Sequence, residues 1–177
     1  PLPQNKEDLL TQRQEYIFKH RTDRRMEFIS KHNEIKRKCL SFKKVKLLTP
    51  GAENEEILVY WDGQSLNDYA QGNGCAFYLN KYGDEYTFCG YFEKGKAKNF
   101  IQSMTVSSSR RNIFIEESNY VDGLRNGIYK KEFYNGLVNE IDYIIVEYQN
   151  NIPTGNIQFM VNVDGRKAVL ENNGNGN

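Results

Sequence analysis

The stretch "NYVDGLRNGIYKKEFYNG" at 119–136 decides the fold of this chain because it recurs at a fixed interval. Shifted by 28 residues, it aligns with "FEKGKAKNFIQSM" at 92–104 and "YQNNIPTGNIQFM" at 148–160. Three columns result, one aromatic and two restricted to Gly or Asn: Phe92, Tyr120 and Tyr148; Gly95, Gly123 and Asn151; Asn99, Gly127 and Gly155. Because Gly and Asn tolerate left-handed backbone, each copy predicts a β-hairpin, and stacked hairpins share one core.

An earlier copy of this hairpin is expected near the start of the repeated region. It begins at Tyr60 in "YWDGQSLNDYAQGNG", where Gly63 follows three residues later. Its turn is several residues longer than in the other copies, and its offset from Phe92 is 32 rather than 28. We therefore expect an additional, irregular hairpin at this point.

Short β-type runs separated by turn sequences continue from Glu56 almost to the C-terminus. The 12 Tyr and 10 Phe supply much of the apolar content and suit a pleated surface. The expected strands are 56–61, 75–80, 85–92, 100–106, 112–117, 128–134, 141–148 and 157–163. The sequence predicts a mainly β fold, a single curved antiparallel meander of repeated hairpins over 51–170. The tail 171–177, "ENNGNGN", is expected to be disordered.

Residues 1–50 differ from this β region in pattern and in charge. From Lys6 to about Leu40 there is no Gly or Pro, and apolar residues recur at spacings of 3, 4 and 7, which predicts a long helix. The Pro-Gly and acidic residues of "LLTPGAENEE" at 47–56 mark the boundary. Residues 1–50 hold 13 Lys and Arg against 6 Asp and Glu, and residues 51–177 hold 11 against 17. The chain therefore joins a basic helical segment to an acidic sheet.

The basic helix has two interpretations. It could dock on the acidic β region or on a partner protein, or it could bind nucleic acid or anionic lipid. The residues expected to contact an anionic partner are Arg24, Arg25, Lys36, Arg37 and Lys38. Charge density reports attraction without naming the partner, so both interpretations stay open.

Residue patterns that carry chemistry are sparse in this sequence. Cys39, Cys75 and Cys89 are odd in number and widely spaced, so we expect buried core cysteines rather than a disulfide framework. His20 and His32 have no ligand-type spacing, and we expect no metal and no cofactor. Paired carboxylates at 55–56 and 116–117 leave a small hydrolase as a remote alternative. No run approaches the roughly 18 apolar residues that a membrane-spanning helix needs.

The repeated segments resemble the MORN repeat family, including the related bacterial antitoxin-like repeats. "EYTFCGYFEKGKAKN" and "NYVDGLRNGIYKKEFYNG" carry the resemblance, which covers roughly 58–165. The copies here are longer than the usual ones of about 23 residues. The last copy departs from the family pattern, because Asn151 replaces its first Gly and Pro153 follows. The resemblance implies a non-enzymatic scaffold, an accessory subunit of a larger protein assembly inside the cell, in cytoplasmic, cytoskeletal or organellar structures.

Aromatic side chains on the expected strands are the candidates for contacting a partner protein. Tyr and Trp are enriched in binding hot spots, although strand aromatics also pack on one another. The partner-binding candidates are Tyr60, Trp61, Tyr86, Tyr91, Tyr120 and Tyr148. An open sheet that exposes so many rings would aggregate, so one face must be covered by the helix or by a partner.

Overall fold

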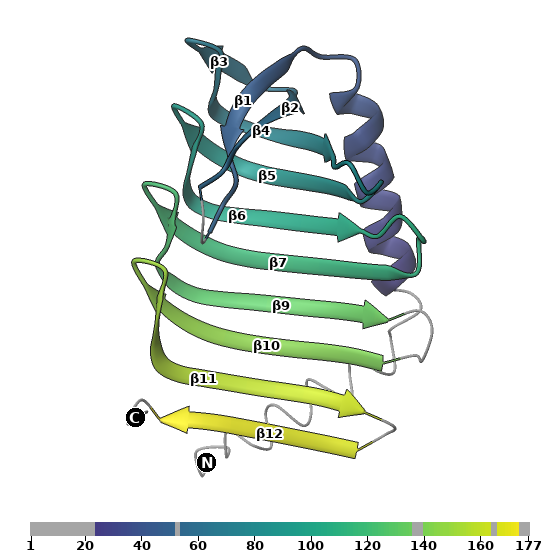
Figure 1. The fold of residues 1–177 in the computed structure, drawn as a ribbon, viewed down its shortest axis with the longest axis vertical. Helices are drawn as coiled ribbons and strands as arrows, with labels where there is room; N and C mark the ends of the chain where they lie inside the picture. Colours follow the sequence, from purple (N-terminus) through teal and green to yellow (C-terminus); the bar gives the residue numbers. More distant parts are fainter. Residues whose placement is uncertain (1–23, 52–53, 136–139, 164–165, 174–177) are drawn as a thin grey trace, which may run out of the picture.

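One helix and one large sheet make up the fold (Figure 1). The computed structural model describes residues 24–51, 54–135, 140–163 and 166–173. Over these residues the helix covers 24–39 and the sheet has 12 strands. The strands are β1 (Lys44–Leu48), β2 (Glu56–Trp61), β3 (Gln64–Leu66), β4 (Tyr69–Leu79), β5 (Glu85–Glu93), β6 (Lys96–Val106), β7 (Asn112–Val121), β8 (Leu124–Arg125), β9 (Gly127–Asn135), β10 (Glu140–Gln149), β11 (Ile152–Val163) and β12 (Arg166–Asn173).

The sheet is an antiparallel meander in the order β1-β2-β4-β5-β6-β7-β9-β10-β11-β12. The short strands β3 and β8 pair with β4 and β7, and a single parallel bridge joins Lys46 of β1 to Tyr69 of β4. The predicted mainly β, antiparallel fold is therefore confirmed. The helix is confirmed over 24–39, and the part of it expected before residue 24 lies outside the described residues.

The hairpin turns follow the 28-residue spacing seen in the sequence. Both central turn residues have positive φ in three successive copies, which fits the primed turns of tight hairpins: Lys94 and Gly95, Asp122 and Gly123, Asn150 and Asn151. The third column also has positive φ throughout: Asn99, Gly127 and Gly155. The expected Gly and Asn columns are thus confirmed, because each position requires left-handed backbone.

Backbone hydrogen bonds tie each turn to the preceding hairpin. The amide of the second turn residue donates to a carbonyl one copy earlier, as in Gly95 to Ala70 at 2.9 Å, Gly123 to Ala97 at 2.9 Å and Asn151 to Arg125 at 3.0 Å. A first copy precedes these three, with Asn67 and Asp68 at its turn and Gly72 at its third column. The additional hairpin expected after Tyr60 is therefore present, but its turn does not fall at Gly63, because Asp68, the equivalent of Gly95, lies five residues further along the chain.

Gly63 has a packing role instead of a turn role. A Cβ atom at Gly63 would lie 2.7 Å from the Trp61 ring, so only Gly fits beside this buried indole. The Trp61 indole N–H donates to the carbonyl of Gln64 at 2.6 Å, which satisfies the polar atom of the buried ring. The aromatic-to-Gly spacing at this point therefore reflects close packing.

Strand β1 and the residues after it run across the ends of the hairpins (Figure 1). This segment bonds to four successive turns through backbone groups and one side chain: Lys46 N to Asp68 O at 2.7 Å, Leu48 N to Gly95 O at 2.8 Å, Gly51 N to Gly123 O at 3.4 Å, and Asn151 Nδ2 to Gly51 O at 3.1 Å. The segment 1–50, expected to be helical, therefore also supplies a strand. Its sequence "KVKLL" alternates exposed and buried side chains, which is the strand period.

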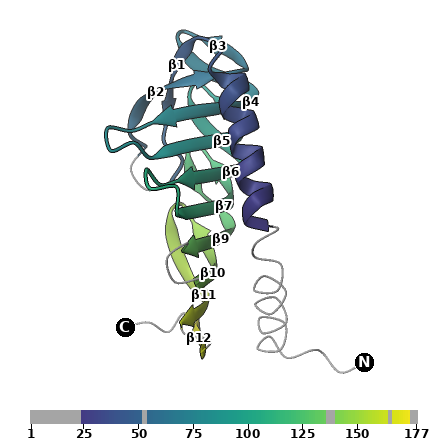
Figure 2. The ribbon, with the colours of Figure 1, turned by 90° about the vertical axis from the view of Figure 1, so that its right-hand side faces the viewer.

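The helix and the β1–β2 segment lie on opposite sides of the sheet (Figure 2), and an apolar core lies under each of them. On one face, β1 and β2 cover the middle strands through residues that include Leu47, Val59 and Trp61. On the other face, Phe28, Ile29 and Ile35 of the helix pack near a cluster formed by Met104, Ile113, Ile115 and Tyr134. We call these the groove face and the helix-side face. Among the described residues, no helix is long and apolar enough to cross a membrane.

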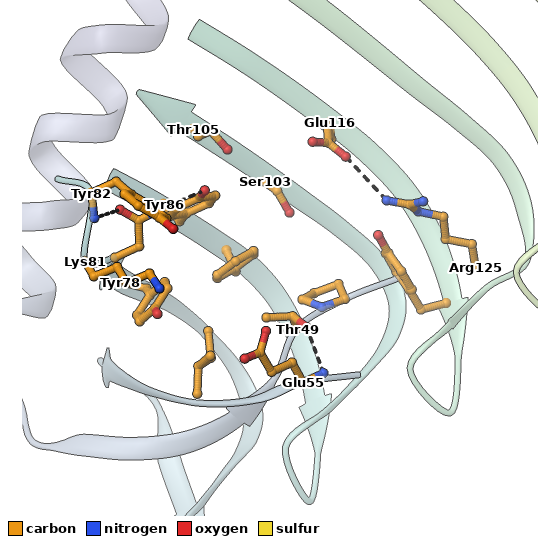
Figure 3. A pocket seen from close by; sticks show the side chains of 15 residues that line it. Thr49, Glu55, Tyr78, Lys81, Tyr82, Tyr86, Ser103, Thr105, Glu116 and Arg125 are labelled. Atoms are coloured by element: carbon orange, nitrogen blue, oxygen red, sulfur yellow. Dashed lines mark hydrogen bonds and ion pairs between the residues drawn. The ribbon is translucent and has the colours of Figure 1, made fainter. Parts of the chain in front are cut away.

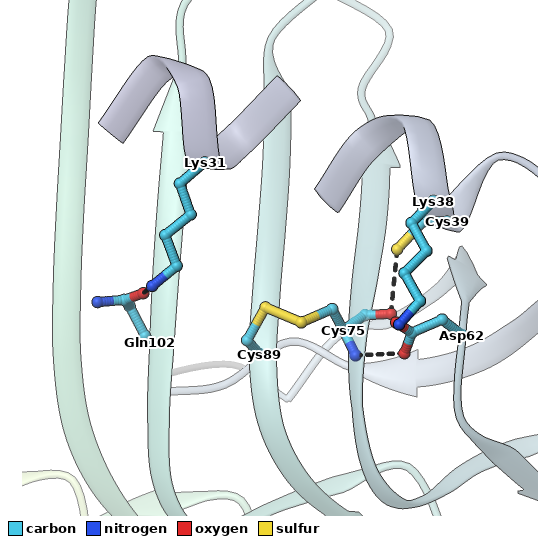
Figure 4. The surroundings of a disulfide bond; sticks show 7 residues. All are labelled: Lys31, Lys38, Cys39, Asp62, Cys75, Cys89 and Gln102. Atoms are coloured by element: carbon cyan, nitrogen blue, oxygen red, sulfur yellow. Dashed lines mark hydrogen bonds and ion pairs between the residues drawn. A yellow bond between two sulfur atoms is a disulfide. The ribbon is translucent and has the colours of Figure 1, made fainter. Parts of the chain in front are cut away.

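The cysteines differ from expectation, because Cys75 and Cys89 form a disulfide between β4 and β5 (Figure 4). These two residues are direct register partners, so the pairing of the strands brings their side chains together. Cys39 is free and buried as expected, and its thiol donates to the Cys75 carbonyl at 3.2 Å. Burial raises the pKa of the Cys39 thiol to about 12, with the nearby Asp62 carboxylate adding to this effect.

The C-terminal strand is a second difference from expectation. β12 spans Arg166–Asn173 and pairs with β11 along its whole length, from Arg166 with Val163 to Asn173 with Asn156. Residues 171–173 of the tail expected to be disordered are therefore in a strand. The remaining residues, 174–177, lie outside the described residues.

The glycine column predicts a specific pattern of stability changes. Gly127 has φ of +92°, and a Cβ atom there would meet nothing within 4 Å, so only backbone strain opposes a side chain. We expect Gly127→Ala to lower the free energy of unfolding by about 1–2 kcal/mol. Gly127→Asn should cost less, because Asn99 occupies the equivalent position with positive φ. Urea unfolding measures both, and equal costs for Ala and Asn would contradict the strain explanation.

The disulfide predicts a measurable response to reductant. It closes a loop with a sequence separation of 14, for which the chain-entropy model gives about 3 kcal/mol of stabilisation. Dithiothreitol should therefore lower the free energy of unfolding of the wild type by about this amount. The Cys75→Ala, Cys89→Ala double variant is the control and should not respond to dithiothreitol. A wild type that is equally stable in both conditions would show that this bond contributes nothing.

Candidate functional site

A groove on the groove face is the candidate site (Figure 3). It has a volume of about 570 Å³, which lies in the range of small-ligand and peptide sites. Its floor consists of side chains from β4 to β7, and one wall is the β1–β2 connection with Thr49, Pro50 and Glu55. The turn between β4 and β5 closes one end with Lys81 and Tyr82, and Arg125 lies at the other end.

Strand alternation explains which residues reach the floor of the groove. On β5, Glu85 and Thr87 are fully buried under the helix, whereas Tyr86 and Phe88 face the groove. Neighbouring strands place matching positions beside them, since Tyr78 pairs with Tyr86 and Phe88 pairs with Ser103. One register shift would turn this set of side chains to the opposite face.

The floor contains a row of three aromatic rings. Tyr78 and Tyr86 have ring centroids 5.8 Å apart, and Tyr86 and Phe88 have centroids 6.3 Å apart with planes at 12°. Such rings offer large apolar contact with little side-chain entropy to lose. This row can therefore hold the apolar part of a ligand without reorganising.

Two hydroxyl groups in the groove each accept one hydrogen bond from within the protein. The Tyr86 hydroxyl oxygen accepts a hydrogen bond from Asn80 Nδ2 at 3.3 Å, and Thr49 Oγ1 accepts one from the Glu55 amide at 3.0 Å. Burial raises the pKa of Tyr86, with Asp84 contributing, so this phenol stays protonated at neutral pH. Both hydroxyls therefore keep a hydrogen to donate to a ligand.

Arg125 and Glu116 form a charged pair at the far end of the groove. The guanidinium lies 3.5 Å from Glu116 Oε2, and the Tyr129 hydroxyl donates to the same oxygen at 2.9 Å. The guanidinium also lies over the Tyr129 ring at 4.6 Å and the Tyr148 ring at 5.5 Å. Burial raises the pKa of Tyr129, and Glu116 adds to this shift. Contacts with Tyr129 and Tyr148 hold the Arg125–Glu116 pair in place. The far end of the groove therefore has a donor and an acceptor in fixed positions.

Ion pairs between the basic helix and acidic residues of the sheet hold the helix on the helix-side face. Glu85 is 1% exposed and accepts hydrogen bonds from Lys36 Nζ at 2.7 Å and from Arg110 Nη1 at 2.8 Å. Burial acts to raise the pKa of Glu85, but the hydrogen bonds from Arg110 and Lys36 outweigh it and hold the pKa below its usual value. Glu85 is therefore an ionised carboxylate that anchors the helix.

A second anchor lies near the other end of the same helix, at Arg24. Arg24 donates to both oxygens of Glu132 at 2.7 Å and to the Tyr134 hydroxyl at 3.1 Å. The Tyr134 hydroxyl in turn donates to Glu132 at 2.6 Å, and its pKa is raised by burial and by this carboxylate. Because Arg24 Nη2 contacts both Glu132 oxygens while Nε donates to the Tyr134 hydroxyl, the guanidinium is held in one orientation and fixes the position of the helix on the sheet.

The five basic residues proposed to bind an anionic partner lie on this helix, and four of them contact the chain's own sheet or loops. Arg24 and Lys36 make the two anchors, Arg25 donates to the Arg110 and Arg111 carbonyls, and Lys38 lies 3.3 Å from Asp62 (Figure 4). Arg37 is exposed on the outer side of the helix. Of the two interpretations of the basic helix, docking on the chain's own β region therefore describes four of the five residues.

Two of the six predicted aromatic residues, Tyr86 and Tyr120, line the groove. Trp61 is buried in the core, and Tyr60 stacks on Phe77 with centroids 6.4 Å apart. Tyr91 alternates to the helix-side face of β5, and Tyr148 packs against Arg125 and Tyr129.

Sequence reasoning missed several groove residues, among them Tyr78, Tyr82, Phe88 and Arg125. Strand alternation from Tyr86 would have found Phe88, because the two are two residues apart on one strand. Arg125 had no such signal, since its place depends on how the β7–β8 turn meets the β1–β2 connection.

The two members of each predicted carboxylate pair lie in different places. Glu55 and Glu116 line the groove, whereas Glu56 accepts a hydrogen bond from Tyr69 and Glu117 accepts one from Gln102. Strand alternation separates Glu116 from Glu117, as it does for any two consecutive strand residues. Within the described part of the chain, no group of three or more His, Cys, Asp and Glu side chains is placed to hold a metal ion.

Comparisons with protein-family models, with curated proteins and with solved structures found no match for this chain. The site is therefore interpreted from its own geometry.

The helix interface predicts a pH dependence of stability. His32 is 1% exposed, and its ring lies 3.8 Å from Glu85 and edge-on to Phe77. Burial lowers the pKa of His32, and Lys36 and Arg110 add to this against the opposing effect of Glu85. The unfolded chain then binds the proton more readily, so stability present above pH 6.5 is lost as pH falls. We expect the melting temperature to drop between pH 7 and pH 5.

The matched variant for this prediction is His32→Phe, which keeps an aromatic ring against Phe77 but cannot titrate. Its melting temperature should change less between pH 7 and pH 5 than that of the wild type, measured by circular dichroism. The carboxylates stay largely ionised in this window, so their contribution is similar in both proteins. Identical pH profiles would show that His32 does not control this part of the stability.

Proposed function

We propose that this chain is a non-enzymatic scaffold protein, an accessory subunit that holds a segment of a partner protein in its groove. The observation that carries this proposal is the aromatic groove itself. Tyr78 and Tyr86 are partly exposed beside the buried ring of Phe88, on a face whose neighbouring surface is covered by β1 and β2. Aromatic rings in a recess are the usual anchors of protein–protein contacts.

Rigidity of the surrounding sheet supports a binding role. Each floor strand from β4 to β7 is paired on both sides, and the helix is fixed on the opposite face by two charged anchors. A preformed surface loses little entropy when a partner binds, so more of the contact energy appears as affinity. The sheet thus serves as a frame that presents the groove.

The positions of the basic residues favour the scaffold over a nucleic-acid or lipid-binding helix. Arg24 and Lys36 are committed to Glu132 and Glu85, and releasing them would remove a cation from beside each buried carboxylate. Binding of phosphate by these residues would therefore oppose the docking of the helix. The groove carries both charge signs, Lys81 and Arg125 with Glu55 and Glu116, and so has no excess of positive charge.

The test compares proteins captured from the native source by three forms of the chain. Tyr86→Ala removes the central ring of the groove, and Tyr91→Ala removes a tyrosine from the opposite face of the same strand. We expect at least one partner, identified by mass spectrometry, to be retained by the wild type and by Tyr91→Ala but lost from Tyr86→Ala. A partner set that is unchanged in Tyr86→Ala would contradict the groove as the binding surface.

A further inference from the structure

Strand β2 runs across the hairpins beside the groove (Figure 1). β1 bonds to successive hairpin turns, and β2 pairs with β1 from Glu56 to Tyr60, so β2 crosses the hairpins in the same way. The groove lining includes Ile57 of β2 and none of the residues 44–48 of β1, all of which the structure describes. The groove therefore lies on the side of β2 that faces away from β1.

This side of β2 is a free strand edge along most of its length. The ladder between β2 and β4 covers only the last two residues of β2, Tyr60 and Trp61. Between Glu56 and Val59, β1 is the only strand among the described residues that pairs with β2. An edge of four residues therefore borders the groove.

The alternation of hydrogen bonds identifies the backbone groups at this edge. In an antiparallel ladder, residues that bond to the partner strand alternate with residues that do not. Thr49 N donates to Glu55 O at 2.8 Å, so the odd-numbered residues of β2 direct their backbone groups to β1. Glu56 and Leu58 therefore direct one N–H and one C=O each away from β1, toward the groove.

Two further observations agree with this alternation. Trp61 N, which is also odd-numbered, donates to Lys43 O at 3.3 Å. On β1, Lys46 and Leu48 donate away from β2, to carbonyls of the hairpin turns. Lys46 and Leu58 are register partners, so Leu58 also directs its backbone groups out of the β1–β2 ribbon, on the opposite side.

The free edge identifies the chemistry of its ligand as an extended polypeptide. N–H and C=O groups that recur every second residue are matched by the backbone of another β-strand. An oligosaccharide or a nucleic acid has no such series of backbone groups. An α-helix uses its backbone groups internally. The floor strands β5 and β6 are paired on both sides, so β2 supplies the edge.

We propose that an extended segment of the partner protein adds as a β-strand to the free edge of β2 and lies over the floor of the groove. This inference rests on the proposed scaffold function and names how the partner is held. Four residues that pair with the edge span roughly 14 Å at about 3.4 Å per residue. The floor strands β4 to β7, about 4.8 Å apart, also extend over roughly 14 Å.

The side chains of the added strand meet apolar surface on both of its faces. Stacked β-layers lie about 10 Å apart, so inward side chains reach the partly exposed rings of Tyr78 and Tyr86. Outward side chains lie beside Leu58, which is 57% exposed. Strand addition therefore covers an exposed leucine and the two tyrosines in one contact.

The test uses peptides selected from a random dodecapeptide library displayed on phage against the immobilised wild-type protein. Amide hydrogen exchange is then measured by NMR with and without a selected peptide. In the free protein, the amides of Glu56 and Leu58 should exchange faster than those of Ile57 and Val59, which bond to β1. Bound peptide should slow the exchange of Glu56 and Leu58 by about tenfold or more, as new hydrogen bonds form.

Two variants at one position separate the backbone donor from the side chain. Leu58→Pro removes the N–H at the free edge and should weaken peptide binding by about tenfold, measured by isothermal titration calorimetry. Leu58→Val keeps the N–H and a β-forming side chain, so its affinity should stay close to that of the wild type. Circular dichroism melting checks that both variants are folded.

Modified peptides test the same bonds without changing the protein. A single N-methyl group is placed on each peptide residue in turn, which removes one backbone donor at a time. Binding to the wild type should be lost at alternate residues of the paired stretch and kept at the residues between them, the period of a strand. A loss of binding without this alternation would contradict strand addition.

The outcomes distinguish this inference from the proposed function. Peptides that depend on Tyr86 but on neither Leu58 nor alternate amides would overturn strand addition and leave the protein-binding groove standing. Selection of no peptide would also overturn the inference, while the capture experiment with the native partner still judges the function. A dimer of the wild type that is absent in Leu58→Pro, measured by analytical ultracentrifugation, would overturn the choice of ligand, because a second copy would then occupy the edge.

Discussion

The fold depends on the stacking of left-handed turns at one end of the hairpins. Each turn has two residues with positive φ, and in the last three turns the second residue donates its amide to the preceding hairpin. Residues 46–51 then bond to all four turns in succession. Because the turns are held at a constant spacing, β1 and β2 are held over the same face of the sheet. The groove exists only because of that placement, since its wall is the β1–β2 connection.

Within the described residues, part of the charge asymmetry of the sequence is satisfied inside the molecule. The basic helix supplies Arg24 and Lys36, and the sheet supplies Glu132 and Glu85 on the face the helix covers. Each carboxylate accepts several hydrogen bonds, which offsets part of the cost of removing it from water. The apolar contacts of Phe28 and Ile29 lie beside these pairs, so burial stabilises the interface while the ion pairs set its position.

Local features of the sequence predict the strands and turns well. The strands around Tyr86 and Tyr120 and the Gly and Asn columns follow from residue preferences that act within a few positions. The disulfide was not predictable in this way, because Cys75 and Cys89 meet only in the particular register of β4 with β5. The groove was predictable only in part. Tyr86 and Tyr120 carry an aromatic signal, whereas Arg125 depends on contacts between segments distant in the sequence.

The same register that hides Glu85 under the helix turns Tyr86 toward the groove. The two faces of β5 therefore cannot vary independently, since a shift of one residue would bury a tyrosine under the helix and expose the anchoring carboxylate. On β4 the disulfide partner Cys75 and the helix-side Phe77 alternate with Ala76 and Tyr78 in the same way. Features that fix the helix and the strand register thus also determine which side chains form the groove. Sequence changes on the covered face should consequently alter binding on the open face through register rather than through contact.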